Sequence, residues 1–68
     1  MMPKYSFPRL YSVWRSKKTG NVATVIGHNK SKRLVHVRFY STTERRIIEA
    51  SVELDDFLQV FYEITLLG

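Results

Sequence analysis

The clearest hydrophobic pattern in the chain lies between residues 34 and 40, where apolar and polar side chains alternate. The apolar positions are Val35, Val37 and Phe39, and the polar positions between and after them are His36, Arg38 and Tyr40. Successive side chains of a strand point to opposite faces, so this pattern predicts a strand with one face in the core. The second face is expected to meet water or a ligand.

Four further segments have the composition of short strands. They cover residues 9–15, 21–27, 45–52 and 62–66, and polar turns separate them. The second segment is apolar on both parities, with Val22 and Ile26 on one and Ala23 and Val25 on the other. This predicts a strand that is buried on both sides, or one that is strongly bent inside a small barrel. The face of segment 45–52 stays open, because both of its parities carry isoleucine.

The hydrophobic period changes near the C-terminus, where apolar residues recur at intervals of three and four. These residues are Leu54, Phe57, Leu58 and Phe61. The spacing predicts one face of a helix of about two turns. Asp55 and Asp56 fall in its first turn, where carboxylates suit the positive end of the helix dipole. We expect the apolar face to cover the core; alternatively, a part left outside the core forms an oligomer interface or a docking face.

Together these elements predict a mainly β fold. The expected architecture is a small, strongly bent, five-stranded antiparallel barrel with a short helical turn before the last strand. A chain of 68 residues is long enough for one domain. We expect this domain to span residues 10–66, preceded by an extended arm over residues 1–9 that holds both prolines.

The composition argues against secreted, disordered and membrane-spanning classes. The chain has no cysteine and 44% hydrophobic residues, unlike a disulfide-stabilised secreted domain or an intrinsically disordered segment. Its apolar runs are only a few residues long, too short to span a membrane. The N-terminus lacks the apolar stretch of a signal peptide. We therefore expect a cytoplasmic protein without a membrane partner.

The net charge of +5 conceals a strong asymmetry along the chain. All 11 Lys and Arg residues lie at or before Arg46, accompanied by a single acid, Glu44, and the other five acids follow Arg46. The first segment thus carries a formal charge of +10 and the second a charge of −5. Such segregation predicts a basic surface for an acidic partner. Alternatively, the two segments neutralise each other within the fold.

Basic and aromatic residues in the predicted turns and on the polar face of strand 34–40 form a candidate site for nucleic acid. The set comprises Lys17, Lys18, Lys30, Lys32, Arg33, His36, Arg38, Tyr40, Arg45 and Arg46. Several positive charges suit a phosphate backbone, and planar side chains can stack on unpaired bases. The ordinary alternative is a solvated surface that keeps the protein soluble.

The stretch VWRSKKTGNVATVIGHNKSKRLVHVRFYSTTERRIIEASVELDDF resembles the Tudor, KOW and Src-homology-3-like barrel class. The shared layout is an aromatic-containing first strand, a polar loop with Gly20, the segments ATVI and VHVRF, and the closing VELDDF. The ending VELDDFLQVF is also similar to that of small proteins carried by bacteriophages and other mobile elements. The resemblance implies a module that binds nucleic acid or peptide, and it implies no catalysis. If the protein is encoded by a phage, the expected cytoplasm is that of the host.

A Tudor domain that reads methylated Lys or Arg needs a cage of aromatic rings around the cation. The rings that could contribute are Trp14, Phe39, Tyr40 and Tyr11. Phe39 is expected on the core face, so we do not expect a complete cage.

No pattern for catalysis, metal binding or cofactor binding stands out. His28 and His36 lack the further ligands that a zinc site requires. Asp55 and Asp56 are explained by their place at a helix N-terminus, and the isolated glycines form no phosphate-binding loop. We therefore expect no enzyme, no metal and no cofactor.

The sequence thus predicts a small basic binding module, an accessory or regulatory protein that associates with DNA or RNA with little sequence specificity. Two alternatives stay open. The first is a module encoded by a phage or mobile element that docks on a host protein, through an acidic surface or an edge strand of that partner. The second is a structural subunit of a homo-oligomer, in which the basic segment of one copy meets the acidic segment of another.

Overall fold

The computed structural model describes residues 7–64, which form one antiparallel sheet and one short helix. The strands are β1 (Val13–Ser16), β2 (Val22–Asn29), β3 (Leu34–Ser41), β4 (Arg46–Glu53) and β5 (Phe61–Glu63). The helix α1 (Leu54–Val60) connects β4 to β5. The prediction of a mainly β fold with five antiparallel strands and a short helix before the last one is confirmed.

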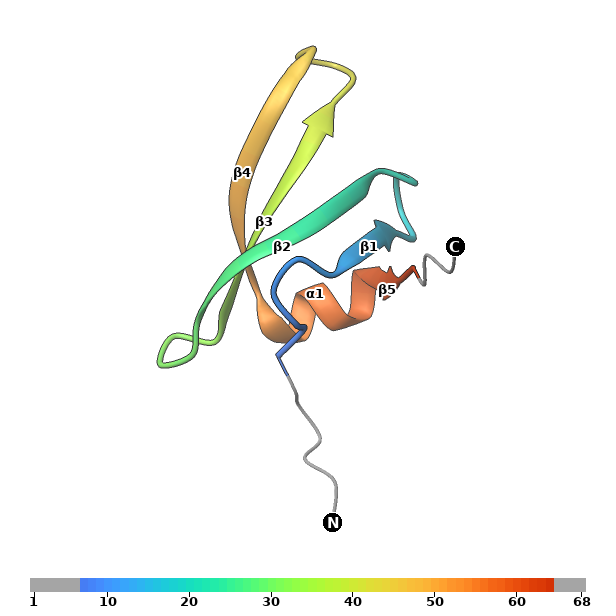
Figure 1. Cartoon of the computed structure of the whole chain (residues 1–68). Coiled ribbons are helices and arrows are strands. Elements are labelled where there is room, and N and C mark those ends of the chain that lie inside the picture. Colours follow the sequence, from blue (N-terminus) through green and yellow to red (C-terminus); the bar gives the residue numbers. More distant parts are fainter. Residues whose placement is uncertain (1–6, 65–68) are drawn as a thin grey trace.

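The sheet has the strand order β4-β3-β2-β1-β5. Its central strand β2 pairs with β1 near its start and with β3 along most of its length. The β2–β3 register shifts between Val25 and Gly27, and an extra residue of this kind bends a strand and increases its twist. The β3–β4 hairpin and the β1–β5 side accordingly diverge from a common region beside the helix (Figure 1). Among the described residues β4 and β5 form the two edges, so the sheet is not closed.

Some predicted strand ends differ from the observed ones. The first strand starts at Val13 rather than at residue 9, because residues 10 and 11 form a turn in which Tyr11 has a φ of 66°. The N–H of Tyr11 donates to the carbonyl of Val25 (2.7 Å), which ties this turn to β2. The second strand continues to Asn29, where the sequence predicts a turn. The last strand begins at Phe61, and the final two positions predicted for it lie outside the described residues.

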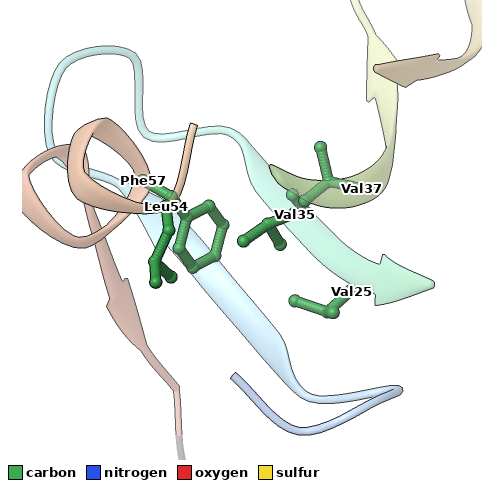
Figure 2. Close-up of a cluster of buried hydrophobic side chains, with 6 residues drawn as sticks. Val25, Val35, Val37, Leu54 and Phe57 are labelled. Carbon is green, nitrogen blue, oxygen red and sulfur yellow. The ribbon is translucent and has the colours of Figure 1, made fainter. Parts of the chain in front are cut away.

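The core consists of six buried side chains from β2, β3 and α1, five of which are labelled in Figure 2. They are Ala23, Val25, Val35, Val37, Leu54 and Phe57. Val35 and Val37 are at most 2% exposed, which confirms the predicted register of β3, and Phe39 on the same face packs partly buried against the core. Val22 is 40% exposed, so the first alternative for β2, burial on both faces, is wrong; the shift of register between Val25 and Gly27 agrees with the second, a bent strand.

Phe57 connects the helix to the rest of the structure. Its ring meets the ring of Trp14 edge-on, with centroids 4.9 Å apart, and stacks on the ring of Phe61 at 4.7 Å. Leu54 and Phe57 are completely buried and Leu58 packs against the core, as the helical spacing predicts. Phe61 completes the same apolar cluster from the start of β5 instead of from the helix.

The end of the predicted N-terminal arm packs on the sheet. Pro8 is buried, and Phe7 packs against the core with its ring edge-on to His28 at 5.2 Å. Nε2 of His28 forms a hydrogen bond with the carbonyl of Pro8. The first six residues of this arm lie outside the described part of the chain.

We expect the substitution Phe57→Ala to reduce the free energy of unfolding by about 3 kcal/mol, because it removes a completely buried ring and leaves a cavity. The control Tyr62→Ala removes a ring that is 46% exposed and is expected to cost about 1 kcal/mol or less. Urea unfolding followed by circular dichroism measures both. A Phe57→Ala protein as stable as the parent would show that the helix does not hold the core.

Candidate functional site

The structure places the predicted basic residues at two opposite ends of the sheet (Figure 1). The β1–β2 and β3–β4 turns both lie toward the Val22 end of β2, at the tips of two hairpins that diverge (Figure 1); together they are here called the two-turn end, which carries Lys17, Lys18, Arg45 and Arg46. The β2–β3 turn forms the other end, the hairpin tip, which carries Lys30, Lys32 and Arg33. The eight residues of β2 lie between the two groups, a separation of about 25 Å for an extended strand. The basic residues therefore do not form one patch.

Four ion pairs connect the described charged side chains, and each of them uses an arginine. The pairs are Arg9–Glu63 (3.4 Å), Arg33–Asp55 (2.8 Å), Arg38–Glu49 (2.9 Å) and Arg46–Glu44 (2.8 Å). Three of the four carboxylates come from the acidic segment after Arg46, so internal neutralisation accounts for part of the charge asymmetry. Solvent-exposed pairs contribute only about 0–1 kcal/mol each. Their main consequence here is to cancel charge locally.

The hairpin tip loses most of its positive charge in this way. Nη2 of Arg33 donates to Oδ1 of Asp55 (2.8 Å), and Glu53 lines the same small hollow as Lys32 and Arg33. The acidic start of α1 is held there because the N–H of Leu54 donates to the carbonyl of Arg33 (2.8 Å). Glu53 and Asp55 thus lie beside Lys32 and Arg33, and with Lys30 counted as well the tip has a formal difference of +1.

The two-turn end keeps its positive charge. Arg46 pairs with Glu44, but within residues 7–64 no carboxylate lies within ion-pair distance of Lys17, Lys18 or Arg45. Arg15 of β1 adds a further exposed cation, and its Nη1 donates to the carbonyl of Gly20 (2.9 Å). Summed over both turns, five cations and one carboxylate give a formal difference of +4. The strongest positive charge is therefore at this end.

Sequence reasoning does not include Arg15 in the candidate site. The signal that could have identified Arg15 is its position in the first strand, directly after Trp14. Trp14 is apolar and packs inward against Phe57. An alternating strand then places Arg15 on the outer face, two positions before Lys17.

Both turns of the two-turn end are built in the same way around a buried serine. Ser16 ends β1 and is 6% exposed, and Ser41 ends β3 and is 9% exposed. The hydroxyl of each accepts a hydrogen bond from the N–H three residues later, at 3.2 Å from Thr19 and 3.1 Å from Glu44. The carbonyl of each accepts from the N–H four residues later, at 2.9 Å and 2.7 Å.

The residue that ends each of these turns has a left-handed backbone. Gly20 has a φ of 78° and Arg45 a φ of 58°. Glycine adopts this region without a steric penalty, whereas any other residue loses about 1–2 kcal/mol there. Arg45 therefore occupies a position that a glycine would fill with less strain.

The predicted outer face of β3 is only partly available to a ligand. Arg38 is held by Glu49 through Nε (3.3 Å) and Nη2 (2.9 Å), and Nδ1 of the partly buried His36 lies 2.7 Å from the hydroxyl of Ser51. Tyr40, by contrast, is 53% exposed. Of the three predicted stacking residues of β3, Tyr40 is thus the one whose side chain the neighbouring strand does not hold by a hydrogen bond.

The described residues add two further findings about ligand classes. Within residues 7–64, no three His, Asp or Glu side chains gather in a way that could hold a metal ion. No helix in that range has the length and apolar character needed to cross a membrane.

Comparison with protein-family models, with curated proteins and with solved structures gives no match for this chain. The resemblance to the Tudor, KOW and Src-homology-3-like class therefore rests on the sequence pattern alone. The ring of Trp14, one candidate for a methyl-binding cage, packs against Phe57, and its Nε1 donates to the hydroxyl of Ser12 (2.8 Å).

We expect opposite responses to exchanging residue types at the ends of the two turns. Gly20→Ala should reduce the free energy of unfolding by about 1 kcal/mol, because alanine is strained at a φ of 78°. Arg45→Gly should leave it within about 0.5 kcal/mol of the parent, since relief of strain offsets the greater freedom of glycine in the unfolded chain. Thermal unfolding of both variants tests this. A strongly destabilised Arg45→Gly protein would contradict the conclusion that the two turns have the same backbone structure.

Proposed function

We propose that this protein binds nucleic acid with little sequence specificity, through phosphate contacts at the two-turn end. The observation that carries the proposal is the uneven cancellation of charge, which leaves a formal difference of +4 at the two-turn end and +1 at the hairpin tip. Phosphates attract clustered cations irrespective of base sequence. Lys17 and Lys18 project from an exposed turn on flexible stems, which suits backbone contacts better than the reading of particular bases.

We also propose a fold class for the protein, the one that its sequence resembles. We infer that the bent sheet, with β5 returning to pair with β1 after a short helix, is an open variant of the Src-homology-3-like barrel class. Such a module would act as a DNA- or RNA-associated accessory or regulatory factor without catalysis of its own. The lack of cysteine favours a cytoplasmic setting for it.

The proposal predicts that the two basic groups contribute unequally to binding. The double variant Lys17→Gln/Lys18→Gln should weaken binding and lower the salt slope, by up to about 0.7 per phosphate that it no longer neutralises on single strands, or 0.9 on duplex DNA. The matched variant Lys30→Gln/Lys32→Gln removes the same charge from the hairpin tip and should have a much smaller effect. Arg45→Gly, which we expect to preserve stability, removes one cation and should weaken binding and lower the salt slope by about half as much as the first variant. Fluorescence anisotropy with labelled oligonucleotides at several salt concentrations measures all three.

Two outcomes would contradict the proposal in different ways. If the parent binds neither single-stranded nor duplex oligonucleotides at low salt, the protein is not a nucleic-acid-binding module. If the tip variant loses as much affinity as the variant of Lys17 and Lys18, the cancellation of charge by α1 does not determine where nucleic acid binds.

One observation favours a second candidate, a protein-interaction module. An apolar hollow of about 190 Å³ opens on the inner side of the sheet, beside Phe39, Ala50, Val52 and Phe61. The neighbouring β4 is an edge strand of eight residues among the described elements, and edge strands can pair with an extended peptide. Binding to a partner protein that persists at high salt and after nuclease treatment would favour this candidate.

A further inference from the structure

Exposed apolar and planar side chains line up across the outer face of the sheet. Tyr62 of β5 pairs with Arg15 of β1, which pairs in turn with Val22 of β2. Beyond β2, on the same face of the sheet, Tyr40 of β3 pairs with Ile47 of β4. Val22 and Tyr40 each follow the last pair of the β2–β3 ladder, Ala23 with Phe39, so the two groups lie on either side of the point where β2 and β3 begin to diverge (Figure 1).

These five residues, which we call the cross-strand row, share one face of the sheet. Residues directly opposite each other on antiparallel strands point to the same side, and their sequence neighbours Ala23, Phe39 and Phe61 pack toward the core. The four large hydrophobic members of the row are 40–61% exposed, and Arg15 is exposed as well. Single exposed hydrophobic residues are ordinary, whereas a contiguous set of them marks an interaction surface.

The cross-strand row runs beside the uncompensated charge of the two-turn end. Lys17 lies two positions after Arg15, and Arg45 lies two positions before Ile47. Planar groups therefore line the sheet where cations line its rim. A single nucleic-acid strand has the complementary groups, namely flat bases that can stack on the planar side chains and phosphates that can pair with the cations. A duplex would match the cations but would offer no exposed base faces.

We propose that the cross-strand row is a stacking platform for unpaired bases, so that the natural ligand class is single-stranded nucleic acid lying across the strands. This inference rests on the proposed function and narrows it to one class of nucleic acid. Tyr40 and Tyr62 are the stacking rings, and Arg15 between Tyr62 and Val22 offers a planar guanidinium to a base. Neighbouring strands lie about 4.8 Å apart, so Tyr62 and Val22 flank Arg15 at that spacing.

The position of this platform differs from the one that the sequence predicts. The sequence places the stacking residues along β3, but Arg38 is paired with the carboxylate of Glu49 and His36 is held by Ser51. Among the described residues the guanidinium of Arg15 donates only to the carbonyl of Gly20, which orients it without cancelling its charge. Tyr40 is shared by both arrangements. The remaining members come from β1, β2, β4 and β5, and only the pairing of the strands brings them together.

The test compares removal of an exposed ring inside and outside the cross-strand row. Tyr40→Ala and Tyr62→Ala remove rings of the row, and Tyr40→Phe keeps the ring. Tyr11→Ala is the matched control, since it removes a ring that is 73% exposed but lies in the turn before β1. Anisotropy titrations of the full chain use a mixed-sequence single-stranded DNA, the corresponding single-stranded RNA and the DNA duplex, and thermal unfolding confirms that each variant is folded.

We expect Tyr40→Ala and Tyr62→Ala each to weaken single-strand binding by about five- to a hundredfold, the effect of removing one base–aromatic stack. Tyr40→Phe and Tyr11→Ala should stay within about twofold of the parent, and duplex binding should change little in any variant. Tighter binding of the parent to the DNA strand or to the RNA strand would show which of the two nucleic acids is the preferred ligand.

Three results would overturn the inference. The first is a parent protein that binds oligonucleotides in a salt-dependent way while Tyr40→Ala and Tyr62→Ala bind single strands as tightly as Tyr11→Ala does. The second is an equal decrease in affinity for duplex and single strands, which would assign the rings to backbone contacts. In both cases the proposed phosphate binding at the two-turn end would stand. The third is a parent that binds no oligonucleotide, which would end both proposals.

Discussion

The packing of Phe57 is the interaction on which the rest of the structure depends. Its ring lies between Trp14 of β1 and Phe61 of β5 and is completely buried together with Leu54. Phe57 and Leu54 lie beside the valines of β2 and β3 (Figure 2). Phe57 also contacts the rings from β1 and β5, so the helix joins the two sides of the sheet. A chain of 68 residues buries few large side chains, so one aromatic anchor supplies a large fraction of its stability.

The same helix determines where charge is available. Its start is tied to the hairpin tip by the hydrogen bond from Leu54 to Arg33, and this places Asp55 beside Arg33. The acidic C-terminal segment therefore neutralises the tip and leaves the opposite end of the sheet positive. The charge asymmetry of the sequence becomes an asymmetry between the two ends of β2, and the core packing of α1 is its physical cause.

The sequence predicts the elements better than it predicts the site. Alternation in β3 and the helical spacing after Glu53 are local signals, and the burial of Val35, Val37, Leu54 and Phe57 agrees with them. The turn at Tyr11 has no such signal, because its hydrogen bond to Val25 joins distant segments. The ion pair between Arg38 and Glu49 and the alignment of Tyr62 with Arg15 depend on strand pairing. No periodicity within one segment reveals such contacts, and for this reason the sequence analysis includes the residues of the hairpin tip and of the two-turn end in one candidate site.

The central claim is that nucleic acid meets the two-turn end and the cross-strand row. The most direct test is a titration of the ¹⁵N-labelled full chain with an unlabelled single-stranded oligonucleotide, followed by the chemical shifts of the backbone amides. We predict the largest changes at residues 15–22, 40–47 and 62, with small changes at residues 30–33 of the hairpin tip. Changes concentrated at the tip, or no changes at all, would contradict the account.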